Sequence, residues 1–268
     1  MQRLVRVENV VKRYAKRNLS GRREEIVALD GVSFSISSGT TLAVLGESGS
    51  GKSTLAACLA CLEVPTSGNI WFSGRNLVEL TEDERREARP QIQLIFQDPA
   101  SSLNPSWNAL EILIEPFVVR RKFKRKEVEE RACSLLERVH LSPELMNRHP
   151  LELSGGQRQR LAIARALALE PKLLILDEAL SALDCSVQAQ IVNLLLELQE
   201  SLGMAYLFIT HNLGMAAHIA DEIAVMNRGR IVEQGPAEEV LKQPRCETTQ
   251  RLLAASPSLK LSVSPALE

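Results

Sequence analysis

A glycine-rich loop carrying a lysine and four hydroxyl residues lies between an apolar segment and a run of good helix formers. Residues 46–53 fit the pattern G-x-x-x-x-G-K-[ST]. The loop consists of Gly46, Glu47, Ser48, Gly49, Ser50, Gly51, Lys52, Ser53 and Thr54. Glycines let a backbone approach phosphates with its N–H groups, and a helix N-terminus adds partial positive charge. Lys52 would reach the β- and γ-phosphates and Ser53 would hold Mg²⁺, so the loop predicts a nucleoside triphosphate site.

Two acids and a histidine follow two further apolar segments. Asp177 and Glu178 end the segment that begins at residue 172, and His211 ends the segment 205–210. Asp177 can hold Mg²⁺ through water, and Glu178 can polarise a water for in-line attack on the γ-phosphate. Two acids also suit an ordinary loop, and a lone histidine is usually a surface or core residue. The phosphate loop earlier in the chain and the expected sheet edge favour the catalytic interpretation.

A third group of polar residues opens a strongly helical stretch. Ser154 is a good N-cap, Gly155 and Gly156 follow it, and Gln157 begins a run of helix formers that reaches residue 168. Free N–H groups at such a helix start can face an anion. A merely capped helix start is the alternative that these residues by themselves favour.

The apolar segments read as buried parallel strands, so an open α/β sheet must position this chemistry. We expect strands at 41–45, 92–96, 172–177 and 205–210, and a helix at 53–62. Residues 4–11, 32–36 and 69–73 read as further strands, and 17–25 as a polar surface loop. Residues 106–150 are helical in pattern, 227–229 form a hairpin turn, and 237–243 form a short helix.

Together these motifs resemble the ATP-binding subunits of ABC transporters over nearly the whole chain. By resemblance, Tyr14 stacks on adenine, residues 46–54 are the Walker A loop, and Gln97 is the Q-loop glutamine. Residues 153–157 are the family signature, 173–178 are Walker B with its catalytic glutamate, 181–184 are the D-loop, and His211 is the switch histidine. The resemblance implies that Glu178, His211 and Gln97 are catalytic. It also implies that Ser53, Gln97 and Asp177 bind Mg²⁺, and that Ser154, Gly155, Gly156, Gln157 and Asp184 contact nucleotide.

The resemblance also implies an architecture and a set of partners. The fold is an α/β P-loop NTPase core, with a mixed central sheet flanked by helices, an N-terminal antiparallel β-subdomain and an inserted α-helical subdomain. The ATP-binding domain spans 1–255, with the helical insertion at about 100–165 and a Ser/Pro-rich tail at 256–268. The expected cofactors are ATP and Mg²⁺. The expected partners are a second ABC ATPase subunit, the same or related, two transmembrane permeases and, indirectly, a solute-binding protein.

Within the family, residues 97–105 and 110–116 are similar to the peptide/nickel importer ATPases. The predicted function is ATP hydrolysis in a two-subunit sandwich that drives import of an oligopeptide, a dipeptide or nickel. The predicted location is the cytoplasmic face of the inner membrane, with peripheral attachment. The chain departs from the family pattern at Asn212, where aspartate is usual, and in residues 243–253.

Composition limits the alternatives. The 268 residues carry 32 basic and 33 acidic side chains, a net charge of −1, so no basic excess points to a nucleic-acid partner. No apolar run approaches the ~18 residues that span a bilayer.

Five cysteines, an odd number, suit a reducing compartment. Cys58 and Cys61 are expected on one face of the helix after the loop, in a buried apolar role rather than a redox or metal-binding one. The basic run 120–126 reads as a solvated helix start, or as a surface for anionic headgroups or a partner's loop.

Two other functions compete with import as interpretations of the sequence. A soluble ABC-type ATPase that acts on nucleic acid, the ribosome or a protein scaffold would carry two Walker A loops, a long coiled-coil insertion or a basic extension. The sequence has none of these features. A purely regulatory nucleotide-binding subunit would have a damaged site, whereas Lys52, Gln97, Glu178 and His211 are all present.

Overall fold

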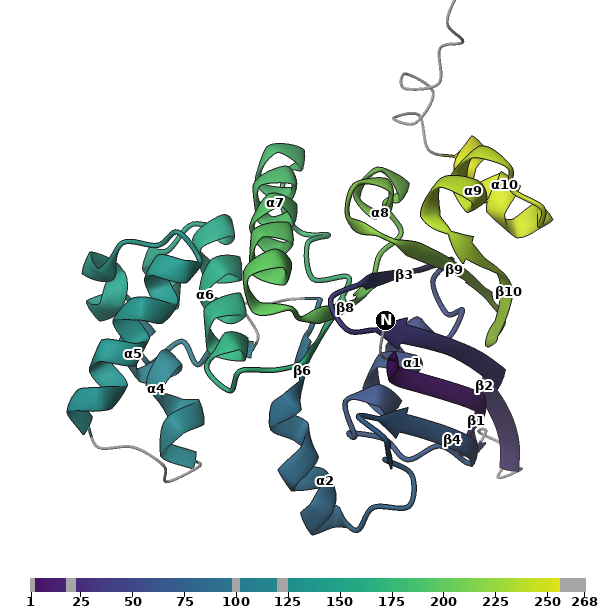
Figure 1. The fold of residues 1–268 in the computed structure, drawn as a ribbon, viewed down its shortest axis with the longest axis horizontal. Coiled ribbons are helices and arrows are strands. Elements are labelled where there is room, and N and C mark those ends of the chain that lie inside the picture. The colour runs from purple at the N-terminus through teal and green to yellow at the C-terminus, as the bar shows by residue number, and fades with distance from the viewer. Residues whose placement is uncertain (1–2, 18–22, 98–101, 120–124, 256–268) are drawn as a thin grey trace, which may run out of the picture.

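Two β-sheets with a helix packed between them form the right-hand part of the molecule in Figure 1. The computed structural model describes residues 3–17, 23–97, 102–119 and 125–255. The smaller sheet has the strand order β2-β1-β4-β5 and the larger has the order β10-β9-β3-β8-β7-β6. The strands are β1 (Arg3–Arg17), β2 (Arg23–Ser37), β3 (Thr41–Gly46), β4 (Ser67–Phe72), β5 (Arg75–Asn76), β6 (Ile92–Ile95), β7 (Leu173–Asp177), β8 (Ala205–Ile209), β9 (Glu222–Asn227) and β10 (Arg230–Pro236).

The larger sheet is parallel except at one edge. Strands β9, β3, β8, β7 and β6 pair in parallel, and β10 pairs antiparallel to β9. Every residue of β3, β7 and β8 is buried, as expected for strands covered on both faces. Alternate residues of β7 enter different cores, because successive side chains of a strand point to opposite faces. Leu173 and Ile175 face the smaller sheet, whereas Leu174 and Leu176 face the helices.

The smaller sheet is antiparallel, and its first two strands are longer than the sequence predicts. The polar stretch 17–25 was expected to be a loop, but β1 extends to Arg17 and β2 starts at Arg23. Backbone pairing continues outward from Tyr14 opposite Ile26 to Ala15 opposite Glu25. The described side chains of Ala15, Glu25 and Ile26 are exposed, and cross-strand backbone bonds extend the ribbon there, so no apolar alternation marks it in the sequence.

Helix α1 (Lys52–Leu59) lies between the two sheets and ends earlier than expected. The prediction of a helix to residue 62 was wrong, because Cys61 adopts a left-handed conformation with φ 57°. Cys58 lies in the helix and Cys61 lies beyond its end, so the two do not share a helix face. Both thiols are buried, and burial raises the pKa of Cys58 to about 12. The thiols therefore stay protonated and pack as apolar groups.

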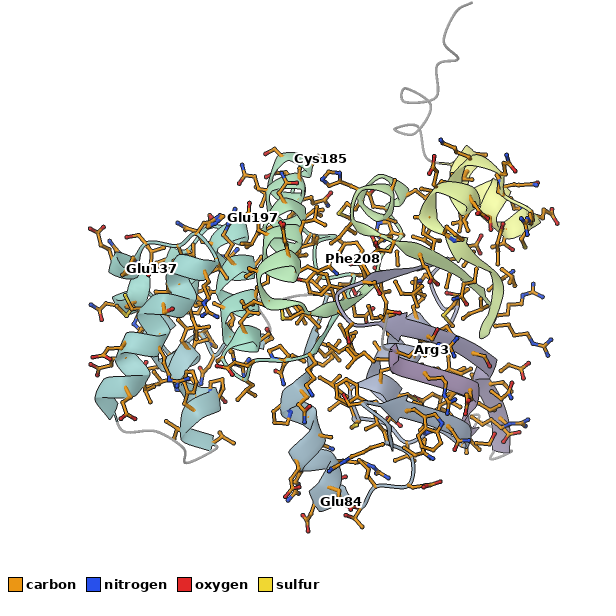
Figure 2. All side chains as sticks on the ribbon, in the orientation of Figure 1. Arg3, Glu84, Glu137, Cys185, Glu197 and Phe208 are labelled. Atoms are coloured by element: carbon orange, nitrogen blue, oxygen red, sulfur yellow. The ribbon has the colours of Figure 1, made fainter. Side chains whose placement is uncertain are left out.

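Helices cover the other face of the larger sheet and form the left-hand part of Figure 1. They include α4 (Ala109–Val119), α5 (Arg125–Arg138), α6 (Gly155–Leu167) and α7 (Cys185–Leu202), with short 3₁₀ turns at Pro143–Asn147 and Pro150–Glu152. Phe208 of β8 lies beneath α7 in Figure 2 and is 2% exposed. His140, just beyond the end of α5, lies against α7, with its Nε2 3.3 Å from Oε2 of Glu197.

Smaller helices complete the fold. Helix α2 (Glu82–Ala88) and the 3₁₀ turn Arg89–Gln91 precede β6, and α8 (Leu213–Ile219) precedes β9. Helix α9 (Ala237–Lys242) matches the predicted short helix, whereas α10 (Glu247–Ala254) was not expected. No helix of the described part of the chain is long and apolar enough to cross a bilayer. The predicted tail 256–268 and residues 120–124 of the basic run lie outside the described residues.

Candidate active site

The carboxyl ends of neighbouring parallel strands bring the predicted catalytic residues to one edge of the larger sheet. Register aligns Val44 of β3 with Ile209 of β8, and Ile209 with Asp177 of β7. The phosphate loop begins at Gly46, two residues beyond Val44, and His211 lies two residues beyond Ile209. Ligands of open α/β sheets bind at this edge, outside the carboxyl ends of the strands.

Two glycines of the loop stand where a side chain would collide with neighbouring backbone. A Cβ on Gly46 would lie 2.4 Å from the carbonyl oxygen of Met226, and one on Gly51 would lie 2.4 Å from that of Ala28. Gly51 also has a φ of 106°, which residues with side chains avoid. The turn between β9 and β10 supports the loop further, because the Gly229 N–H donates to the Ser50 carbonyl at 2.9 Å. Strand β2 and the β9–β10 hairpin therefore enclose the loop.

Lys52 curls back over the loop that precedes it. Its ammonium donates to the carbonyl oxygens of Gly46 and Glu47, each at 2.9 Å, and lies 3.8 Å from Glu178 Oε1. The side chain is only 5% exposed. Burial lowers the pKa of Lys52, and the nearby carboxylates of Glu178 and Asp177 oppose that shift. The ammonium thus occupies a poorly hydrated position, where a phosphate oxygen would be a strong partner.

Asp177 ends β7 with one carboxylate oxygen satisfied and the other buried without a partner. The satisfied oxygen accepts a hydrogen bond from the Ser53 hydroxyl, whereas Oδ1 has no partner. Burial raises the pKa of Asp177, and the Ser53 hydrogen bond partly offsets this effect. A carboxylate beside a serine hydroxyl supplies the oxygen ligands that Mg²⁺ prefers. The orphaned oxygen indicates that these two residues fit such an ion.

Glu178 is held in a strained backbone conformation between Lys52 and His211. Its φ is 47°, and its N–H donates to the Ile209 carbonyl at 3.0 Å. Oε2 lies 3.5 Å from His211 Nδ1, while Oε1 faces Lys52. Strain of this kind persists where surrounding contacts impose it, and it is frequent at functional sites. The carboxylate is 22% exposed, so a water can reach it.

Two further members of the predicted site lie on β1 and just beyond β6. Gln97 is exposed two residues beyond β6, beside the residues 98–101 that the structure does not describe. Tyr14 is half-buried on β1, and the Lys12 ammonium lies 4.9 Å from its ring centroid. Sequence reasoning missed Lys12, although its spacing of two residues from Tyr14 was a signal that both face the same side of a strand.

The signature residues form the capped start of α6, in the helical part of the molecule. The Ser154 hydroxyl accepts from the Gln157 N–H at 3.2 Å, and Gln157 Oε1 accepts from the Ser154 N–H at 2.9 Å. A Cβ on Gly156 would lie 2.8 Å from a methyl of Val187 on α7, so glycine permits close packing of these two helices. Their described contacts are with α6 itself, Leu183 and α7 rather than with Lys52 or Glu178.

Asp184 and Asn212 both cap helices. Asp184 Oδ1 accepts from the Val187 N–H at the start of α7, and hydrogen bonds lower the pKa of this carboxyl. Asn212 Oδ1 accepts from the Met215 N–H at 3.1 Å and begins α8. Asparagine and aspartate are equally good N-caps, so the departure from the family pattern at position 212 costs the helix little.

The fold and the site together define a class of protein. A parallel sheet, a glycine loop leading into a helix, a buried lysine and a strand-end Asp-Glu pair are the parts of a P-loop nucleotide-binding protein.

Comparisons with known proteins identify the family. The ABC transporter family model matches residues 29–181. The chain is 45% identical over 251 residues to the dipeptide transport ATP-binding protein DppF of Haemophilus influenzae, covering 93% of this chain and 77% of that protein. It is 43% identical to DppF of Escherichia coli, covering 96% of this chain and 78% of that one. A dimeric ATP-binding cassette, MJ0796 bound to ADP and Pi, matches with a TM-score of 0.77 at 32% identity, over 87% of this chain and 98% of that one.

This chain therefore belongs to the ABC transporter family, as an ATP-binding subunit that couples ATP hydrolysis to transport. Its fold is that of the ABC cassette, and the predicted antiparallel N-terminal sheet and mixed central sheet are confirmed.

The raised pKa of Asp177 predicts how stability depends on pH. The folded protein holds this proton more tightly than the unfolded chain, so the carboxyl's contribution to stability falls as pH rises above the unfolded value of 3.8. Asp177→Asn removes that dependence. We expect the variant to gain free energy of unfolding relative to wild type as pH rises from 4 to 7 without nucleotide. Urea denaturation across this range measures the difference, and a difference that stays constant with pH would contradict the assignment.

Proposed function

We propose that this chain hydrolyses ATP at the Lys52–Glu178 cluster to drive the import of a dipeptide or another short peptide. The observation that carries the proposal is the convergence of Lys52, Asp177 and Glu178 at one sheet edge. Ser53 is hydrogen-bonded to Asp177, and His211 Nδ1 lies 3.5 Å from Glu178 Oε2. The relatives named above are dipeptide transport proteins, which favours a short peptide over nickel as the solute.

The loop and the Walker acids hold the substrate in this proposal. Backbone N–H groups of residues 46–54 and the Lys52 ammonium bind the phosphates, with the partial positive charge of the α1 N-terminus behind them. Ser53 and Asp177 would hold Mg²⁺, with Gln97 completing the set by resemblance. When bound, the ion neutralises charge that develops between the β- and γ-phosphates. The contact between the Lys52 ammonium and a phosphate oxygen is the strongest of these interactions, because a buried ammonium attracts an anion strongly.

Glu178 and His211 act on the attacking water. The carboxylate accepts a proton from a water placed in line with the γ-phosphate, and the αL backbone of Glu178 aims it toward Lys52. His211 Nδ1 lies beside the other carboxylate oxygen and orients it. Gln97, at the end of β6, would sense the γ-phosphate and relay its presence to the helical part.

A complete site requires a second subunit. Ser154, Gly155, Gly156 and Gln157 begin α6 and do not reach this chain's own loop in the described contacts, so they are free to meet the nucleotide of another copy or a related ATPase. Asp184 would lie at the same junction, and Tyr14 would stack on adenine. The similar cassette MJ0796 is a dimer. Two permeases packed on the helical part, served by a solute-binding protein, would place this assembly on the cytoplasmic face of the inner membrane.

Replacing Glu178 separates hydrolysis from binding. Glu178→Gln keeps the shape but loses the base, so we expect ATP affinity to be retained and phosphate release to fall by roughly 10²- to 10⁴-fold. Calorimetric titration and a phosphate-release assay measure the two quantities. Glu137→Gln on the outer face of α5, visible in Figure 2, is the matched control and should keep the wild-type rate. Hydrolysis by Glu178→Gln at the wild-type rate would refute the base assignment.

Substitutions at Ser154 test whether the signature serves another subunit. Ser154→Asp and Ser154→Asn are both good N-caps, but only aspartate places a negative charge where a phosphate would lie. We expect Ser154→Asp to bind ATP as a dilute monomer yet lose hydrolysis, while Ser154→Asn keeps most of it. Lys52→Ala should instead weaken ATP binding itself.

Mixing Ser154→Asp with Lys52→Ala tests whether, in a homodimer, each site combines the phosphate loop of one subunit with the signature of the other. Mixed dimers contain one intact composite site, so an equal mixture should recover roughly a quarter of wild-type activity, since half of the dimers are mixed and each has one good site of two. Retention of hydrolysis by Ser154→Asp alone would contradict a role for the signature at any nucleotide.

Transport assays test the solute. In cells whose own copy of this gene is deleted, the wild-type chain should restore uptake of a radiolabelled dipeptide, and Glu178→Gln should not. Uptake of ⁶³Ni²⁺, measured in the same strains, should be unchanged by the deletion. Normal dipeptide uptake in the deletion strain, or loss of nickel uptake, would contradict the proposed solute.

A further inference from the structure

An ion pair with an aromatic ring beside it lies on β1, outside the catalytic cluster. The Lys12 ammonium donates to Glu63 Oε2 at 2.6 Å and to the Val64 carbonyl at 2.8 Å, and it lies 4.9 Å from the centroid of the Tyr14 ring. The Lys12 side chain is 12% exposed, unlike the usual surface lysine. Burial lowers the pKa of Lys12, but the hydrogen bond and charge of Glu63 outweigh that effect and raise it, so Lys12 stays charged.

The contacts of Lys12 belong to a wider attachment between β1 and the segment that follows α1. The Thr66 N–H donates to the Val11 carbonyl at 2.7 Å, and the Arg13 N–H donates to the Thr66 hydroxyl at 3.0 Å. Helix α1 begins at Lys52 of the phosphate loop. The segment that fixes Lys12 thus follows the helix that begins in the phosphate loop.

The same stretch of β1 passes close to the phosphate loop. Lys12 pairs with Leu29 of β2, and Tyr14 pairs with Ile26. Gly51 of the loop packs against Ala28 and Leu29. Tyr14 is therefore two strand positions from the point where β2 contacts the loop, which is within reach of a nucleotide held there.

We propose that Lys12 is a positioning residue for the nucleotide base: it covers one face of the Tyr14 ring and so presents the opposite face for stacking of a purine. The inference rests on the proposed function, because it requires Tyr14 to stack on the base. A cation is attracted to the negative face of an aromatic ring, and Glu63 and Val64 hold this cation in place. A ring fixed in one orientation loses less conformational freedom when a base stacks on it.

Lys12→Met tests the proposal, because it keeps the length and apolar stem of the side chain and removes the charge. We expect its affinity for ATP to fall about three- to tenfold, the size of the ordering cost that a ring already fixed in one orientation avoids on binding. Affinity for inorganic tripolyphosphate, which has no base, should stay at the wild-type value. Lys12→Arg should restore most of the ATP affinity. Lys242→Met, which breaks an exposed ion pair with Glu238 on α9, is the matched control.

A double-mutant cycle with Tyr14→Leu shows whether Lys12 affects ATP affinity through the Tyr14 ring. If Lys12 acts through the ring, Lys12→Met should cause no further loss of ATP affinity in the Tyr14→Leu background. Equal losses for ATP and tripolyphosphate, or additive losses in the double variant, would overturn the proposal. Unchanged ATP affinity in Tyr14→Leu would also overturn it, and in that case loss of binding in Lys52→Ala would leave the proposed function standing.

Discussion

The site depends on opposite charges held out of water at one edge of a parallel sheet. Lys52 and Asp177 are each less than a tenth exposed, and burying such groups is costly unless each finds a partner. The protein supplies those partners incompletely: carbonyl oxygens and Glu178 for the lysine, and one serine hydroxyl for the aspartate. Lys52 therefore still lacks a full anionic partner, and Asp177 lacks a cationic one. This imbalance supports the metal–phosphate pair that we propose as the ligand of the site.

The rest of the fold holds these charges in place. Parallel pairing fixes Asp177 against Ile209, and the Ile209 carbonyl in turn holds Glu178 in its left-handed conformation. The two apolar cores on opposite faces of the sheet prevent a register slip, because a shift by one residue would exchange the faces of every strand residue. The geometry of the candidate site is therefore a consequence of the sheet, although the side chains proposed to be catalytic lie just beyond it.

Most of the site could be predicted from the sequence because it is local. The loop, the Asp177–Glu178 pair and His211 each directly follow a buried strand, and parallel pairing then brings them to one edge. Contacts across long sequence separations could not be predicted. The packing of Gly229 and Ala28 on the loop, the Lys12–Glu63 pair and the contact of Gly156 with Val187 depend on how distant elements meet. The early end of α1 depends on one backbone conformation, at Cys61, which helix propensity does not encode.

The enclosure of the phosphate loop by two sheets affects how natural variation in this protein should be interpreted. Any side chain at Gly46 or Gly51 meets backbone atoms of β9 or β2, so substitutions there disturb folding and the amount of protein in the cell as well as ligand contact. Glu178 and His211 lie just beyond the sheet edge, and their side chains are 22% and 62% exposed. A survey that scored only protein abundance would therefore group the two glycines with core residues, and it would miss the two residues that we propose to act on the attacking water.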